Sequence, residues 1–151
     1  MSEQDPKKVH DDWVNKLAEY FLKQGYRVIK EGEMFSLEGW KEPDLILLKG
    51  TSLEAVVEVI VMEPYENADR SVLEKCKKIR DYISPPQIIV FEPVQYLDKT
   101  RLSEKVGHYQ KLFNLQHAPK SYSEIEQLFA EKWERLHNLN VTFWNEENVT
   151  L

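Results

Sequence analysis

Asp44 and Glu58 are the two residues of this sequence best placed to do chemistry. Asp44 follows Pro43 at the start of a short apolar run, and Glu58 stands in the middle of the next such run. An ionised carboxylate in an apolar strand is costly unless it is paired or holds a metal ion. Two carboxylates on neighbouring strands can bind one hard cation such as Mg²⁺, which takes oxygen ligands. Such an ion can activate water and stabilise the charge that develops on a phosphate.

Strands must position these two carboxylates. Runs rich in β-branched and other apolar residues, bounded by Gly, Pro or Ser, predict four strands, at residues 26–31, 44–49, 53–62 and 87–92. Successive side chains of a strand point to opposite faces, so Glu58 shares one face with Val56 and Ile60. The third run is almost continuously apolar, which predicts a strand buried on both faces.

Two helices complete the predicted core. Helical spacing of apolar residues predicts the first helix over residues 6–24, and Gly25 is a natural C-terminal cap. The second helix is expected to begin at Asn67 or Asp69 and to stop at Ser84. Its predicted apolar face consists of Val72, Cys76, Ile79 and Ile83. The order helix, three strands, helix, strand therefore fills about residues 6–95.

The rest of the chain, about residues 96–151, is predicted to be a C-terminal helical extension. A helical pattern of apolar residues is formed by Leu102, Val106, Tyr109 and Phe113. A capping box at residues 123–126 begins another helix, and residues 141–144 are predicted to form an edge strand. No repeat or linker marks a second domain, so we expect a single domain over residues 1–151.

Composition narrows the function classes. The chain has 151 residues, a formal net charge of −6 and one cysteine, Cys76. An acidic protein has no general attraction for nucleic acid, so such contacts would need a local basic patch. A single cysteine excludes an internal disulfide framework and a cysteine-based zinc site, and it indicates a reducing, cytoplasmic location. We expect no secretory segment and no membrane partner, because no apolar stretch is long enough to span a bilayer as a helix.

Pro43-Asp44 and Glu58, taken with the element order, resemble the PD-(D/E)XK nuclease-like superfamily, which includes many restriction endonucleases and the archaeal Holliday-junction resolvases. The resemblance covers roughly residues 6–95. It implies an α/β fold with an αβββαβ restriction-endonuclease-like core, in which helices flank a mixed central sheet. It also implies that Asp44 and Glu58 lie on adjacent strands and bind Mg²⁺ or Mn²⁺.

The third member of the family signature departs from the pattern. The family's Lys, two positions after the acidic residue, is replaced here by Ile60. In the family this Lys positions or activates the attacking water. Lys75, Lys78 and Lys30 are candidates to supply an amine from another element. We choose Lys75, because a helix packed over the sheet can project it toward the strand ends beside Asp44.

Several other residues could do chemistry, but most of them are expected to have structural roles. Many family members carry an acidic residue on the first helix, for which Asp12 and Glu19 are candidates. The basic cluster at residues 75–80 can touch phosphates, but the solvated face of a helix is the favoured interpretation. Trp40 either borders the site or covers the open end of the sheet. Surface or locally hydrogen-bonded positions are expected for the histidines, which lack metal-ligand spacing: His10, His108, His117 and His137.

Two function hypotheses follow from these residues. The first is a metal-dependent endonuclease, a phosphodiester hydrolase that acts on DNA rather than RNA through Asp44, Glu58 and Lys75. The second is a catalytically inactive nuclease-like domain that binds nucleic acid or a protein partner. The retained carboxylates favour the first, whereas Ile60 and the net acidity favour the second. A homodimer is compatible with both. Convergence of the two carboxylates, with a Lys amine nearby, discriminates between them.

Overall fold

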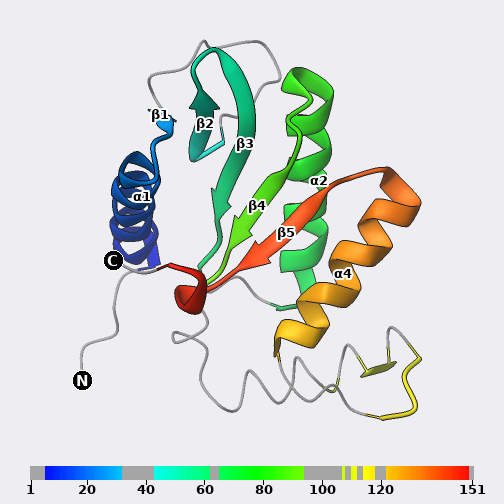
Figure 1. The fold of residues 1–151 in the computed structure, drawn as a ribbon. Helices are drawn as coiled ribbons and strands as arrows, with labels where there is room; N and C mark the ends of the chain where they lie inside the picture. Colours follow the sequence, from blue (N-terminus) through cyan, green and yellow to red (C-terminus); the bar gives the residue numbers. More distant parts are fainter. Residues whose placement is uncertain are drawn as a thin grey trace, which may run out of the picture.

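The chain folds as an α/β structure in which helices cover a five-stranded sheet (Figure 1). The computed structural model describes residues 6–31, 43–61, 65–93, 107, 110–111, 114–117 and 122–149. The helices are α1 (Pro6–Lys23), α2 (Tyr65–Ile83), α4 (Tyr122–His137) and the short 3-10 helix η2 (Glu146–Asn148). The strands are β1 (Arg27–Lys30), β2 (Leu45–Lys49), β3 (Ser52–Val59), β4 (Ile88–Phe91) and β5 (Val141–Trp144). The predicted α/β class is therefore confirmed.

The sheet is mixed, and its strands lie in sequence order from β1 to β5. β1, β2 and β3 pair antiparallel, whereas β4 runs parallel to β3 and β5 runs parallel to β4. All four predicted core strands share this sheet, and the predicted edge strand at residues 141–144 is its fifth member. The segment expected to be a helical extension thus also contributes to the sheet.

The β2–β3 ladder is shorter than predicted at the end that carries the acidic residues. β2 begins at Leu45 and β3 ends at Val59, rather than at residues 44 and 62. The reason is local: the backbone N–H of Asp44 and that of Val59 both donate to carboxylates. Ile60 keeps one sheet bond, from its backbone N–H to the carbonyl of Phe91, at 2.9 Å. Side chains therefore replace the backbone ladder at this point.

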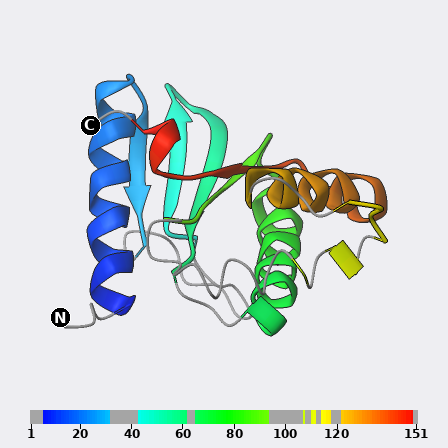
Figure 2. The ribbon, with the colours of Figure 1, turned by 90° about the horizontal axis from the view of Figure 1, so that it is seen from below.

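Two hydrophobic layers lie on opposite faces of the sheet (Figure 2). On one face, α1 packs against the sheet through Val9, Trp13, Leu17 and Phe21. On the other face, α2 and α4 pack through Val72, Cys76, Ile79, Ile125, Phe129 and Trp133. Within β3, Val57 belongs to the first layer and Val56 to the second, so the predicted alternation and two-sided burial are confirmed.

The end of α1 follows its local sequence signal, whereas α2 and α4 both begin before their predicted caps. Gly25 has φ +94°, a conformation that favours glycine, and the N–H of Tyr26 bonds back to the carbonyl of Phe21 at 3.0 Å. This closes α1 as predicted. In contrast, α2 already begins at Tyr65, so Asn67 and Asp69 lie inside the helix rather than capping it.

Some sequence predictions fall outside the described residues. These are the position of Trp40, the apolar face at Leu102, Val106, Tyr109 and Phe113, and the side chain of Ser123 in the predicted capping box. Among the helices that the structure describes, none has the length and apolar character needed to cross a membrane.

Candidate functional site

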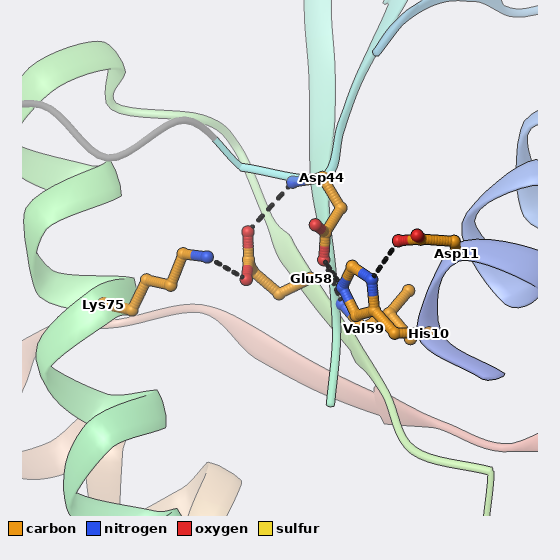
Figure 3. Close-up of polar contacts among 6 residues, drawn as sticks. All are labelled: His10, Asp11, Asp44, Glu58, Val59 and Lys75. Atoms are coloured by element: carbon orange, nitrogen blue, oxygen red, sulfur yellow. Dashed lines mark hydrogen bonds and ion pairs between the residues drawn. The ribbon is translucent and has the colours of Figure 1, made fainter. Parts of the chain in front are cut away.

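Asp44 and Glu58 meet at the end of the β2–β3 ladder (Figure 3). In the antiparallel register Leu45 lies opposite Val57, so Asp44, one residue earlier, falls beside Glu58, one residue later. The backbone N–H of Asp44 donates to Oε1 of Glu58 at 3.0 Å. The backbone N–H of Val59 donates to Oδ2 of Asp44 at 2.7 Å. Both acidic residues are buried, with exposed fractions of 3% for Asp44 and 4% for Glu58.

Lys75 brings an amine to the same point from α2 (Figure 3). Its Nζ lies 2.8 Å from Oε2 of Glu58. The neighbouring Cys76 is fully buried under the sheet, so the helix holds the Lys75 stem against the apolar layer and leaves its side chain 33% exposed. The structure therefore brings together Asp44, Glu58 and Lys75, the three residues selected from the sequence.

The alternative lysines lie elsewhere. Lys30, on β1, donates to Oδ1 of Asn15 at 3.1 Å, and Lys78 is exposed on α2. Ile60, which stands where the family has its Lys, packs against the hydrophobic layer formed by α2 and α4. Its side chain therefore serves packing, and the amine reaches Glu58 from the helix.

Burial governs the protonation of Glu58. Desolvation, which has the largest effect, and the nearby charge of Asp44 together raise its pKa from 4.5 to about 8, against the lowering effect of Lys75. For Lys75, burial by itself lowers the pKa, but the Glu58 carboxylate outweighs this and holds the pKa above its usual 10.5. Glu58 and Lys75 therefore both keep their protons to a higher pH than usual. A bound divalent cation would offset the repulsion between the two carboxylates.

His10 is a member of this cluster that the sequence analysis did not select. It lies on α1, and its Nε2 is 3.2 Å from Oδ2 of Asp44, while its Nδ1 is 3.1 Å from Oδ1 of Asp11 (Figure 3). The hydrogen bond with Asp44 raises the pKa of His10 from 6.5 to about 9, against the lowering effect of burial. His10 has the predicted local hydrogen bond, to Asp11, but its contact with Asp44, which spans 34 residues, was not predicted.

One signal could have identified His10 in the sequence. It lies at the border of the apolar face of α1, between the buried residues Val9 and Trp13. A histidine at the border of a buried face is well placed to reach the end of a sheet. The acidic residues expected to fill this role, Asp12 and Glu19, are both exposed.

The donor atoms suit a cation that retains water ligands. Among the residues that the structure describes, no three His, Cys, Asp or Glu side chains gather into a complete metal cluster. Mg²⁺ is usually held by only one or two carboxylates, with water and substrate oxygens completing its shell. Asp44 and Glu58 are two buried carboxylates that lie side by side.

Two further features lie apart from this cluster. Cys76 is a free, buried thiol whose pKa is raised to about 12 by burial, so it is unreactive and serves packing, as predicted. A cavity of about 350 Å³ lies between α4 and the strand β5, where residues such as Glu126, Thr142 and Asn145 line it. The predicted edge strand at residues 141–144 lines part of this cavity, but no predicted site residue does.

Comparison of the chain with protein-family models, with curated proteins and with solved structures gives no match.

Proposed function

We propose that this chain is a metal-dependent nuclease of the PD-(D/E)XK type, with its catalytic amine supplied by Lys75. The observation that carries the proposal is the convergence of Asp44, Glu58 and Lys75 at one end of the sheet, within the distances given above. This arrangement favours a nuclease over an inactive domain of similar sequence. The order of the first six elements, α1, β1, β2, β3, α2 and β4, supports the same restriction-endonuclease-like core.

Each residue has a separate role in this scheme. Asp44 and Glu58 would hold Mg²⁺ or Mn²⁺ through carboxylate oxygens. When bound, the ion would activate water and stabilise charge on a phosphate. The ammonium of Lys75 stays on the α2 side of Glu58, where it can orient a water and stabilise the negative charge of the transition state.

The relocation of the amine has a geometric explanation. Ile60, just beyond the end of β3, packs against the layer formed by α2 and α4, and Lys75 of α2 reaches Glu58 two residues earlier. A Lys at position 60 would point into the same space that Lys75 enters from the helix. The two positions therefore deliver an amine to one region from opposite sides. In this chain position 60 holds Ile60, whose side chain packs in the hydrophobic layer and supplies no amine.

DNA is the first substrate to test, with RNA as the comparison. Because the chain carries a net charge of −6, affinity for a polyanion must come from local groups. The basic residues around Lys75, together with the bound cation, would supply that attraction. We therefore expect binding that weakens steeply with salt.

A specific observation also favours a second candidate, an inactive nuclease-like domain that binds nucleic acid or a protein. Each carboxylate already has a cationic partner within the chain: His10 for Asp44 and Lys75 for Glu58. A buried acid and base can be retained as a closed polar network with no catalytic role.

The deciding experiment is a cleavage assay with Mg²⁺, with Mn²⁺ and with EDTA, on linear DNA, branched DNA and RNA. Glu58→Gln keeps the shape of the side chain and removes its charge, so it should abolish cleavage. Glu54→Gln, on the same strand but away from the Asp44–Glu58 pair, is the control and should cut like the wild type. Metal-independent cutting, or equal activity in both variants, would rule out the proposed mechanism. Failure of the wild type to cut any substrate would favour the binding domain.

A further inference from the structure

The distance between His10 and Asp44 suits two ligands of one metal ion. Nε2 of His10 and Oδ2 of Asp44 are 3.2 Å apart. Ligand atoms about 2.1 Å from a metal lie roughly 3.0 Å apart at a right angle and roughly 3.4 Å apart at the tetrahedral angle. The observed separation lies between these values. A cation could therefore bind both atoms with little movement of either side chain.

Asp11 gives His10 the second partner that metal-binding histidines use. The Nδ1 atom of His10 lies 3.1 Å from Oδ1 of Asp11, on the opposite side of the ring from Asp44 (Figure 3). A histidine that binds a metal commonly donates its other ring N–H to a carboxylate, which fixes the tautomer and the ring orientation. Asp11 thus holds the proton on Nδ1 and leaves Nε2 directed at Asp44.

The position of His10 leaves the rest of the site undisturbed. It approaches Asp44 from α1, whereas Lys75 approaches Glu58 from α2, so the two cationic side chains lie on opposite sides of the carboxylates (Figure 3). The His10 side chain is 28% exposed, so this side of the cluster borders solvent. A cation at Asp44 can therefore meet His10 without displacing Lys75.

From these contacts we propose that His10 is a metal ligand alongside Asp44, so that the site prefers a divalent transition metal such as Mn²⁺ or Co²⁺ to Mg²⁺. The inference rests on the proposed function in one respect, the assignment of Asp44 as a ligand. Mg²⁺ takes oxygen ligands, whereas imidazole suits transition metals. A nitrogen donor in the site therefore changes which cation the protein selects.

The test measures metal binding in the absence of nucleic acid. Co²⁺, followed by visible absorption, and Mg²⁺, followed by calorimetry, are titrated into the wild type, His10→Gln, Asp11→Asn and His117→Gln. His117 is exposed and lies outside the site, so its variant is the matched control. We expect His10→Gln to weaken Co²⁺ binding by at least about tenfold, and Asp11→Asn to weaken it by about tenfold. Mg²⁺ binding should stay unchanged or improve in His10→Gln, because Asp44 then has no competing partner.

A second measurement uses the unaltered protein, in case a variant folds poorly. Zn²⁺ is added to ¹⁵N-labelled wild type, and the ring nitrogens of His10 are followed by NMR. A shift of Nε2, with Nδ1 keeping its proton, supports the inference. An unperturbed His10 ring in the presence of bound Zn²⁺ overturns it, as does an equal loss of Co²⁺ and Mg²⁺ affinity in His10→Gln.

Failure of this inference and failure of the nuclease function give different results. If His10→Gln binds Co²⁺ like the wild type while Mg²⁺-dependent cleavage persists, the inference is wrong and the nuclease stands. If Co²⁺ binds through His10 and no nucleic acid is cut under any condition, the inference stands and the nuclease function is wrong.

Discussion

Asp44 and Glu58 are tied together through the backbone as well as through their charges. The N–H of Asp44 donates to the Glu58 carboxylate, and the N–H that follows Glu58, on Val59, donates to the Asp44 carboxylate. This reciprocal exchange ends the β2–β3 ladder and fixes two buried acids side by side. A carboxylate that accepts backbone N–H bonds is restricted in orientation, which is a requirement for a precise cation site.

Lys75→Ala should lower both stability and cleavage. It removes the cation beside a buried carboxylate, so we expect a loss of about 1–3 kcal/mol in the free energy of unfolding. Cleavage should fall by about 10²–10³, by analogy with the loss of one preorganised donor. Urea unfolding and initial cleavage rates measure the two effects. Lys77→Ala is the control, because Lys77 pairs only weakly with Glu74, at 3.5 Å. Equal cleavage by both variants would exclude Lys75 from the reaction.

Ile60→Lys should rescue the loss of Lys75. In the wild type it should change cleavage little, because Lys75 already supplies the amine. It should cost about 1–3 kcal/mol of stability, since the Ile60 side chain packs against the layer formed by α2 and α4. In the Lys75→Ala background it should restore much of the lost rate, because position 60 faces the same space. A double variant as slow as Lys75→Ala would contradict the shared location of the two amines.

The metal-free protein should become less stable as the pH rises from weakly acidic to weakly alkaline values. The pKa of Glu58 is raised by burial from 4.5 to about 8, so its contribution is fully present below pH 4.5 and is lost as the pH rises through about 8. The pKa of His10 is raised, chiefly by the hydrogen bond with Asp44, from 6.5 to about 9. Its contribution is therefore present below pH 6.5 and lost through about pH 9.

This pH dependence is checked by urea unfolding in EDTA at several pH values. Glu58→Gln should remove the part of the decline that ends near pH 8, and His10→Gln the part that ends near pH 9. The differences between variant and wild type matter here, because other groups titrate over the same range. Differences that do not change with pH would show that neither group is perturbed in the folded protein.

Added divalent cation should stabilise the protein more at high pH than at low pH. A cation competes with the protons held by Glu58 and His10, so its apparent affinity rises as they are lost. At a free concentration one hundred times its Kd, the cation should add about 2.7 kcal/mol to the free energy of unfolding. Thermal unfolding with and without Mn²⁺ at pH 6 and pH 8.5 measures the difference. Asp44→Asn should abolish the effect, and an equal effect at both pH values would contradict the competition.

Gly25→Ala should destabilise the junction between α1 and β1. Gly25 has φ +94°, where a Cβ is strained even though no atom lies within 4 Å of the position it would take. We expect a cost of about 1 kcal/mol, measured by urea unfolding. Gly107→Ala is the control, since its Cβ would also meet no atom within 4 Å and its φ lies outside the positive range. Equal stability of the two variants would contradict the strain argument.

The sequence by itself determined the elements of the fold and two of the site residues. Strands and helices were predictable because apolar periodicity and turn residues act locally. The strand at residues 141–144, whose predicted and observed bounds agree, is an example. Asp44 and Glu58 were identifiable because a carboxylate in an apolar run is conspicuous whatever the neighbouring elements do.

The tertiary structure decided which other side chains reach those carboxylates. Lys75 and Lys78 lie about one turn apart on α2. The position of α2 along its axis relative to β3 places the Lys75 amine at Glu58 and leaves Lys78 exposed. His10 reaches Asp44 because of the way α1 crosses the other face of the sheet. No local sequence pattern specifies how a helix is shifted or rotated on a sheet. That placement results from the packing of whole layers, which sequence spacing alone does not specify.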